Sequence, residues 1–313
     1  MKQNRLILAL TYTSIVFFTL ISFCSEAQNS AKTLKRIIID PGHGGTDPGA
    51  NGKYSTEAAV SLAISLKLEE YIHDAIPDVE VVLTRRTDIY NSVVEKANIA
   101  NAAKGDLFIC IHTNSADPSR NREIIGHTKK TYTVTKKGVK RKVTRVVPLY
   151  RTTYTPSTAR GTETFIYNVV KSDQRKDMAN DAVDDVVEKL DSVSEKQIKE
   201  LDAADPTRSM MVSLLTQQYF QRAASLALTI EEEFKAAGRL SREAKQRQKG
   251  IWVLAAVQMP AVLVETGFIS NPEDEDYLNS EEGQNQICEV ITKSVLRYKN
   301  SLENQKKTNE IGR

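Results

Sequence analysis

Short apolar runs alternate along the chain with longer segments in which apolar residues recur every three or four positions. The short runs predict buried strands, and the longer segments predict amphipathic helices. Strands are expected over residues 34–40, 79–84, 106–111, 160–167 and 261–264, and helices over residues 57–72, 93–103, 209–235 and 283–298. Because strands that are apolar on both faces alternate with helices, the pattern predicts an α/β domain with a mainly parallel sheet.

Two segments interrupt this alternation and are expected to be insertions, at about 123–157 and 172–204, within one domain that covers residues 28–313. Within the first insertion, residues 129–145 contain eight Lys or Arg and no acidic residue, interleaved with Thr, Val and Tyr. The alternation predicts a β-hairpin or an unstructured loop. Such a segment is either a solvated projection or a patch that attracts an anionic polymer. The second insertion is acidic, and its pattern is helical.

The beginning of the chain has the pattern of an export signal. A short basic start precedes residues 6–23, which are almost entirely apolar, and small residues follow at 25 and 27. This pattern predicts a signal peptide over residues 1–27 that is cleaved after Ala27, and therefore a periplasmic protein. A membrane anchor is the alternative, since about 18 apolar residues could just span a bilayer. The polar residues within the run weaken that interpretation, and the bulky residue before Cys24 disfavours a lipoprotein.

Net charge and cysteine content indicate which partners and which kinds of stabilising cross-link this sequence favours. The formal net charge is +3, and it falls to +2 without residues 1–27, so nothing in it points to a nucleic-acid partner. Beyond the signal, only Cys110 and Cys288 remain, each within an apolar, periodic segment. A single disulfide is possible in an oxidising compartment, but two such cysteines predict buried free thiols rather than a disulfide framework or a metal cluster.

Four residues that could carry chemistry lie where predicted elements begin or end. His43 and His112 each follow a strand directly, Glu265 ends another strand, and Glu57 opens a helix. Because ligands of an open α/β sheet bind beyond the carboxyl ends of its strands, we expect these side chains to meet at one edge. Two imidazoles and one carboxylate are a usual catalytic zinc set that leaves a position open for water. A second carboxylate, not bound to the metal, would be free to move protons.

The glycines around His43 suit a loop that passes close to a ligand without side-chain obstruction. A phosphate-binding P-loop is excluded, because no Lys-Ser or Lys-Thr pair follows these glycines. A helical His-x-x-x-His pair is absent as well, so the usual metalloprotease helix is not present in this sequence.

Five blocks in order resemble the zinc-dependent N-acetylmuramoyl-L-alanine amidases, in particular the cell-separation group with the long catalytic domain. The blocks are 40–50 (DPGHGGTDPGA), Glu57, 83–85 (LTR), 109–114 (ICIHTN) and 265–271 (ETGFISN). They span most of the region from residue 34 to residue 300. The chain departs from the common family pattern at Ala58, where lysine is more frequent, and at Thr113, where alanine is usual. Neither departure falls on a residue expected to bind metal.

The resemblance implies roles for the four candidate residues. His43, Glu57 and His112 would hold Zn²⁺, and Glu265 would be the catalytic carboxylate. The reaction would be hydrolysis of the amide bond between N-acetylmuramic acid and L-alanine in peptidoglycan, for wall remodelling and daughter-cell separation. The implied fold is a twisted, mostly parallel sheet of about six strands flanked by helices.

The resemblance also implies regulation by a partner. In relatives that separate cells, an inserted helix covers the zinc until an activator protein with a metallopeptidase-like fold withdraws it. Residues 172–204 lie in the corresponding region and are expected to have this inhibitory role.

Two other functions use the same features of the sequence. A periplasmic zinc peptidase that acts on wall peptides would need the same ligands and the same water. A non-catalytic wall-binding protein could keep the fold, and the basic stretch would favour it. The presence of all four candidate site residues favours an enzyme over the binding protein.

Several polar residues near these blocks are expected to support the site. Asp40 is a plausible hydrogen-bond partner for one imidazole. Arg85 and Arg86 follow a strand, and we favour a structural salt bridge to Asp88 or Asp47 over contact with substrate carboxylates.

The remaining polar candidates are expected to lie at a helix start or on the surface. Ser270 and Glu273 have the spacing of a capping box that starts a helix at residue 270. The other two histidines, His73 and His127, are expected to be solvent-exposed.

Overall fold

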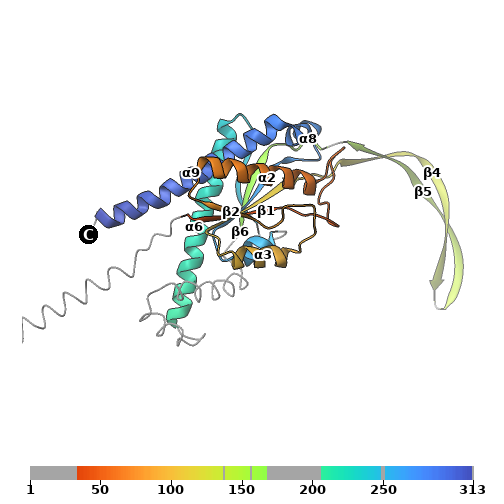
Figure 1. The fold of residues 1–313 in the computed structure, drawn as a ribbon. Helices are drawn as coiled ribbons and strands as arrows, with labels where there is room; N and C mark the ends of the chain where they lie inside the picture. Colours follow the sequence, from red (N-terminus) through yellow and green to blue (C-terminus); the bar gives the residue numbers. More distant parts are fainter. Residues whose placement is uncertain (1–33, 137, 156, 168–205, 248–250, 312–313) are drawn as a thin grey trace, which may run out of the picture.

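A computed structural model describes residues 34–311 apart from 137, 156, 168–205 and 248–250. Its centre is a six-stranded sheet (Figure 1). The strands, in their order across the sheet, are β2 (Glu80–Leu83), β1 (Arg36–Pro41), β3 (Leu107–Asn114), β8 (Ala261–Phe268), β6 (Thr162–Tyr167) and β7 (Ser241–Arg247). All neighbouring strands are parallel except β8 and β6, which are antiparallel. The predicted mostly parallel sheet of about six strands is therefore confirmed.

Helices cover both faces of this sheet. The first face packs against α2 (Glu57–Ala75), α6 (Pro206–Ala236) and α9 (Glu281–Ile311), and the second against α3 (Val93–Ala102) and α7 (Trp252–Ala256). A short helix, α8 (Pro272–Asn279), follows β8 and packs on it and on α9. The alternation along β1 shows how one strand serves both layers, because Ile37 and Ile39 enter the first core and Ile38 enters the second. All three isoleucines are fully buried, which explains why strands of this sheet read as continuous apolar runs.

The sequence pattern predicted the central elements but not the periphery. Each strand and helix expected within the described residues is present, with ends shifted by a few residues in most cases. The edge strand β7 was not predicted, because its sequence SREAKQR is almost wholly polar and none of its residues is fully buried. The predicted cap at Ser270 is wrong by one residue. Asn271 is the N-cap of α8, and its side-chain oxygen accepts hydrogen bonds from the backbone N–H groups of Glu273 and Asp274.

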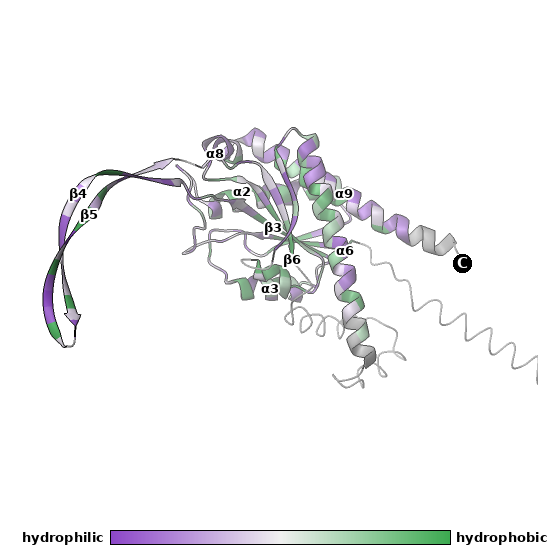
Figure 2. Ribbon diagram, turned by 180° about the vertical axis from the view of Figure 1, so that it is seen from behind, coloured by the Kyte–Doolittle hydropathy of each residue, from purple (hydrophilic) through white to green (hydrophobic). Residues whose placement is uncertain are grey.

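The basic insertion forms a hairpin, which decides between the two predicted forms. Its strands, β4 (Ser119–Lys136) and β5 (Val139–Thr155), pair with each other along their whole length and make a separate two-stranded sheet. Figures 1 and 2 show this ribbon reaching away from the α/β domain. The predicted signal peptide and the predicted inhibitory segment 172–204 lie outside the described residues.

The predicted states of the cysteines and of the two remaining histidines are confirmed. Cys110 and Cys288 are free and buried. The side chains of His73 and His127 are exposed. Among the helices of the described part of the chain, none is both long enough and apolar enough to cross a membrane.

Candidate metal centre

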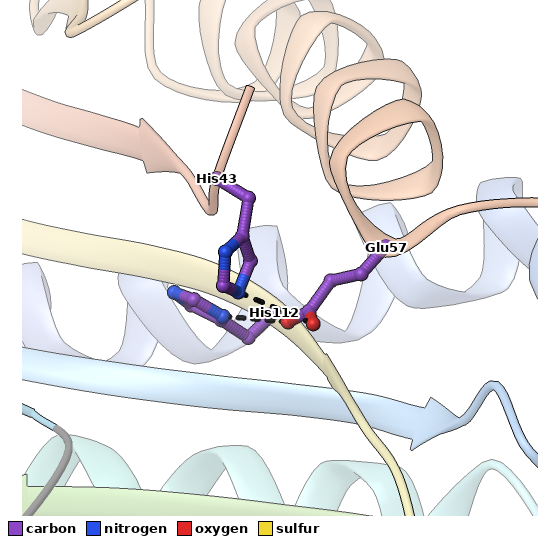
Figure 3. Close-up of side chains that lie close together, drawn as sticks. All are labelled: His43, Glu57 and His112. Carbon is purple, nitrogen blue, oxygen red and sulfur yellow. Dashed lines mark hydrogen bonds and ion pairs between the residues drawn. The ribbon is translucent and has the colours of Figure 1, made fainter. Parts of the chain in front are cut away.

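The fold brings His43, Glu57 and His112 together at the carboxyl ends of the central strands (Figure 3). His43 lies two residues beyond the end of β1, and His112 lies two residues before the end of β3. Glu57 is the first residue of α2, the helix that packs across these two strands. The expectation that strand ends and a helix start would place these residues at one edge is therefore confirmed.

Glu57 lies between the two imidazoles. Its Oε1 is 2.7 Å from Nδ1 of His112, and its Oε2 is 3.2 Å from Nε2 of His43. The two rings lie edge to face, with centroids 5.0 Å apart. One ligand atom from each of the three residues lies within 4.8 Å of the others. Two nitrogen donors and one carboxylate oxygen at this spacing fit the first shell of a divalent ion such as Zn²⁺.

The local structure around Glu57 fixes its carboxylate. Thr56 caps the helix by accepting a hydrogen bond from Ala59, so the chain enters α2 at a defined angle. The Glu57 carboxylate accepts backbone N–H bonds from Ala50 and Thr113, at 2.9 and 3.2 Å. Because Ala50 lies in the loop after His43 and Thr113 follows His112 in β3, Glu57 joins the three segments of the site. Its side chain is almost fully buried.

Two glycines leave the space that the three side chains fill. A Cβ at Gly42 would lie 2.6 Å from the His112 ring. A Cβ at Gly49 would lie 2.6 Å from both the Glu57 carboxylate and the His43 ring, and the positive φ of Gly49 is unfavourable for other residues. The predicted need for glycine beside the ligands is thus explained at these two positions.

His43 is oriented by Asp47 rather than by the residue predicted. Asp47 Oδ2 lies 2.8 Å from Nδ1 of His43, so a proton on Nδ1 leaves the Nε2 lone pair directed at the metal set. The predicted partner, Asp40, is buried and forms its hydrogen bonds with other residues. The sequence held a signal for this, because Asp47 follows His43 by four residues within the same tight loop, where Gly44 and Asp47 exchange backbone hydrogen bonds.

Asp40 instead forms part of a buried network beneath the end of β1. Its carboxylate lies 3.1 Å from Nζ of Lys96 and accepts hydrogen bonds from Thr84 and from the Cys110 thiol. Lys96 also donates to the carbonyl of Pro41, at 2.6 Å. Since Asp40 and Lys96 are both almost inaccessible to water, the network holds the strand end from which the His43 loop departs.

The predicted partners of Arg85 and Arg86, Asp88 or Asp47, are wrong, although Arg86 does form a structural salt bridge. Arg85 is buried, and its guanidinium donates to the backbone carbonyls of Pro41, Gly42 and Ala58. It thereby ties the His43 loop to the start of α2. Arg86 forms a bidentate pair with Glu69 on the surface of the domain.

Glu265 lies on β8, directly opposite His112 in the pairing of β8 with β3. Its side chain is 7 % exposed, and its Oε2 has no hydrogen-bond partner among the described residues. Burial raises the pKa of Glu265, and although the neighbouring His112 lowers it, the net result is about 7. A carboxyl group with this pKa can both accept and release a proton near neutral pH.

A second carboxylate, Glu163, lies opposite Glu265 on β6 and was not predicted. Burial raises the pKa of Glu163, but hydrogen bonds from Arg242 and Lys245 outweigh this effect and lower it below the usual range. The two cations lie 2.5 and 2.9 Å from one oxygen, and Asn114 donates to the other oxygen. Both cations belong to the unpredicted edge strand β7, so the sequence pattern gave no signal for this group. The two adjacent carboxylates are thus held in different protonation ranges.

Charge within the ligand set favours an ionised Glu57. Burial lowers the pKa of His43, but its hydrogen bonds and charge interactions with Glu57 and Asp47 outweigh burial and raise it to about 9. Burial raises the pKa of Glu57, yet the bonds to His112 and His43 lower it far below the usual range. The site therefore presents a carboxylate and attracts positive charge, which suits a divalent cation.

This donor set, beside a buried carboxyl group at the edge of an α/β sheet, is typical of a mononuclear metal hydrolase. The sequence profile of the N-acetylmuramoyl-L-alanine amidases matches residues 37–297. The chain belongs to this family.

Curated relatives carry the same description. The chain is 27 % identical over 297 residues to a probable N-acetylmuramoyl-L-alanine amidase, AmiB, of Haemophilus influenzae, covering 93 % of this chain but 58 % of the relative. It is 27 % identical over 263 residues to a putative N-acetylmuramoyl-L-alanine amidase of Buchnera aphidicola, covering 84 % and 95 % of the two chains.

A solved structure shows the same fold. It is the crystal structure of an N-acetylmuramoyl-L-alanine amidase from Clostridium difficile 630, with a TM-score of 0.52 and 23 % identity. The match covers 86 % of this chain and 99 % of the other. The α/β architecture derived from the sequence pattern is therefore the architecture of this family.

Proposed function

We propose that this chain hydrolyses the amide bond between N-acetylmuramic acid and L-alanine in peptidoglycan, with Zn²⁺ held by His43, Glu57 and His112. The observation that carries the proposal is the convergence of these three ligands beside Glu265, in a chain of the amidase family. Two histidines and a glutamate leave one coordination position open, as a catalytic rather than a structural zinc site requires.

Bound zinc would supply a Lewis acid and lower the pKa of a bound water towards about 7. The role of Glu265 is to accept the proton of the attacking water and to return it to the nitrogen of the leaving L-alanine. Its burial and its pKa of about 7 suit both steps. Asp47 keeps the His43 ring in the orientation that metal binding requires. Arg85 holds the backbone of the His43 loop in place.

The cell wall is the proposed place of action. The predicted signal peptide over residues 1–27 would deliver the protein across the inner membrane to the periplasm, where peptidoglycan is accessible. The family match supports peptidoglycan as the substrate.

The test is mass spectrometry of purified peptidoglycan after incubation with zinc-loaded residues 28–313 and with the matched variant Glu265→Gln. Release of stem peptides that begin with L-alanine by the wild type alone supports the amidase and the role of Glu265. Cleavage within the stem peptides, with the glycan still substituted, would replace the amidase by a zinc peptidase. Retention of the protein on the wall without any released peptide would favour a wall-binding protein.

An activator protein with a metallopeptidase-like fold remains part of the proposal. It would act on residues 172–204, and their role stays a prediction from the sequence. Deletion of this segment from residues 28–313 is expected to raise activity on soluble muropeptide. Unchanged activity of the deletion variant would refute the inhibitory role.

A further inference from the structure

The β4–β5 hairpin has no role in the proposed reaction and stands apart from both cores. None of its described residues is buried, and among the described elements each strand packs extensively only against the other. An 18-residue strand such as β4 extends over about 60 Å at roughly 3.3 Å per residue. Figures 1 and 2 show the ribbon leaving the domain from the loops after β3 and before β6.

Positive charge is concentrated on this hairpin. Residues 119–155 contain eleven Lys or Arg and a single acidic residue, Glu123. Because the whole chain has a formal net charge of only +3, the rest of the protein is net acidic. The hairpin is therefore a cationic arm on an anionic body, and its attraction is towards anionic surfaces.

The two faces of the distal hairpin differ in composition. In a two-stranded ribbon, cross-strand partners and alternate residues share a face. The pairing of Tyr132 with Val143 and of Val134 with Arg141 therefore shows which side chains lie on which face of the hairpin. One face, here called the apolar–basic face, carries Tyr132, Val134, Val139 and Val143 together with Lys130, Lys136, Arg141 and Arg145. The opposite face, here called the threonine face, carries Thr131, Thr133, Thr135 and Thr144 together with Lys129, Lys140, Lys142 and Val146.

The apolar side chains of the first face are open to solvent. Tyr132 is 45 % exposed, Val134 43 % and Val139 56 %. A two-stranded ribbon with nothing packed on it is marginally stable in water, so covering this face would stabilise it. The lysines along both strands disfavour edge-to-edge pairing with a second copy.

We propose that the apolar–basic face docks on an anionic phospholipid bilayer. Lys130, Arg141 and Arg145 would pair with lipid phosphates, while the valines and the ring of Tyr132 enter the boundary between headgroups and acyl chains. Apolar side chains interleaved with cations on one face fit a surface that is both charged and apolar. A hydrated polyanion offers no apolar phase, and lysine is depleted at protein–protein interfaces.

The inference deepens the proposed function, on which it rests for the location of the protein. A hydrolase of the wall acts close to the membrane. A hairpin of this length, docked on the membrane, would hold the catalytic domain in the space between the membrane and the wall. Each basic residue near an anionic surface strengthens binding about fivefold, so a few contacts suffice for measurable binding at low ionic strength.

The experiment measures co-sedimentation of residues 28–313, which contain every described element, with vesicles. One set of vesicles contains phosphatidylglycerol and phosphatidylethanolamine, and the other contains phosphatidylcholine alone. Binding is expected to the anionic vesicles only and to fall with added salt. Equal binding to both sets, or binding to neither, would overturn the proposal.

A matched pair of variants tests the face. Val143→Asp and Val146→Asp make the same change in charge at nearby positions of β5, but on the apolar–basic and the threonine face respectively. Val143→Asp is expected to weaken binding to anionic vesicles at least about tenfold, and Val146→Asp about threefold or less. An equal loss in both variants would show general polyanion attraction and refute docking by this face.

Two controls separate membrane docking from unfolding of the variants and from binding to the wall. Both variants are expected to keep the melting temperature of the parent chain, because the hairpin packs in neither core. Vesicle binding is measured without hydrolysis, so its outcome is independent of the amidase test. Retention on purified peptidoglycan without vesicle binding would assign the hairpin to a wall polymer and overturn membrane docking.

Discussion

Glu265 lies directly opposite His112 in the parallel pairing of β8 with β3. Neighbouring strands are about 4.8 Å apart, so this register places a buried carboxyl group beside His112, a proposed metal ligand. A shift of one residue in the register of β8 would turn Glu265 to the other face of the sheet. It would also move the apolar neighbours of Glu265 into the opposite core. The packing of the core thus sets the geometry of the proposed reaction.

Metal binding is expected to stabilise the folded chain through His112. Zinc at a hundred times its dissociation constant would add about 2.7 kcal/mol to the free energy of unfolding of metal-free residues 28–313. Thermal denaturation with and without zinc measures this gain. His112→Ala is expected to abolish it, whereas His73→Ala, which alters an exposed histidine, keeps it. A gain that survives in His112→Ala would place the metal elsewhere.

The stability of the metal-free protein is expected to depend on pH through Glu265. Because burial raises the pKa of Glu265 from 4.5 in the unfolded chain to about 7 in the folded chain, the folded state binds its proton more tightly. The proton on Glu265 therefore contributes to the free energy of unfolding. This contribution is fully present below pH 4.5, is lost as the pH rises, and is gone above about pH 7.

The corresponding variant removes this dependence. A difference of this size in pKa corresponds to about 3 kcal/mol. Glu265→Gln is therefore expected to be more stable than the wild type at pH 8 by up to about 3 kcal/mol, and nearly equal to it at pH 4.5. Urea denaturation in the presence of a chelator at the two pH values measures the difference. A constant difference across this range would contradict the burial of an ionisable Glu265.

Gly49 is expected to be essential for the metal centre because of space rather than backbone freedom alone. Gly49→Ala places a Cβ 2.6 Å from Glu57 and from His43, so metal affinity should fall at least tenfold and the free energy of unfolding by about 2 kcal/mol. Gly238→Ala is the matched control, since φ is also positive there but no atom lies within 4 Å of the new Cβ. Isothermal titration with zinc compares the variants. If Gly49→Ala and Gly238→Ala lost the same affinity for zinc, backbone strain alone, and not the lack of space beside Glu57 and His43, would explain the loss.

The buried pair of Lys96 and Asp40 is expected to couple stability to the site. Lys96→Met leaves the Asp40 carboxylate without its cation, at a cost of about 3–5 kcal/mol. Adding Asp40→Asn removes the uncompensated charge, so the double variant should regain part of this loss. Denaturant unfolding of the two single variants and the double variant gives the coupling energy. Additive effects would show that the two groups do not interact.

The amino-acid pattern was sufficient to predict the α/β class and the four principal site residues. Apolar runs such as that around Ile38 can only be buried on both faces of a sheet, and polar residues at the ends of such strands must meet at one edge. His43, Glu57, His112 and Glu265 were therefore expected together from their places in the pattern, and the structure brings them together. The resemblance to the amidases then implied which of the two glutamates is a ligand.

The folded structure was needed to establish which groups support these residues. Asp47 rather than Asp40 orients His43, and Arg85 binds carbonyl groups rather than an acid, because side-chain direction depends on backbone geometry that local periodicity does not specify. Glu163 acquires its cations from β7, an edge strand whose exposed positions need no apolar residues. Elements that bury apolar surface leave a pattern in the sequence. Contacts between polar groups brought together by folding do not, because no periodic burial constrains them.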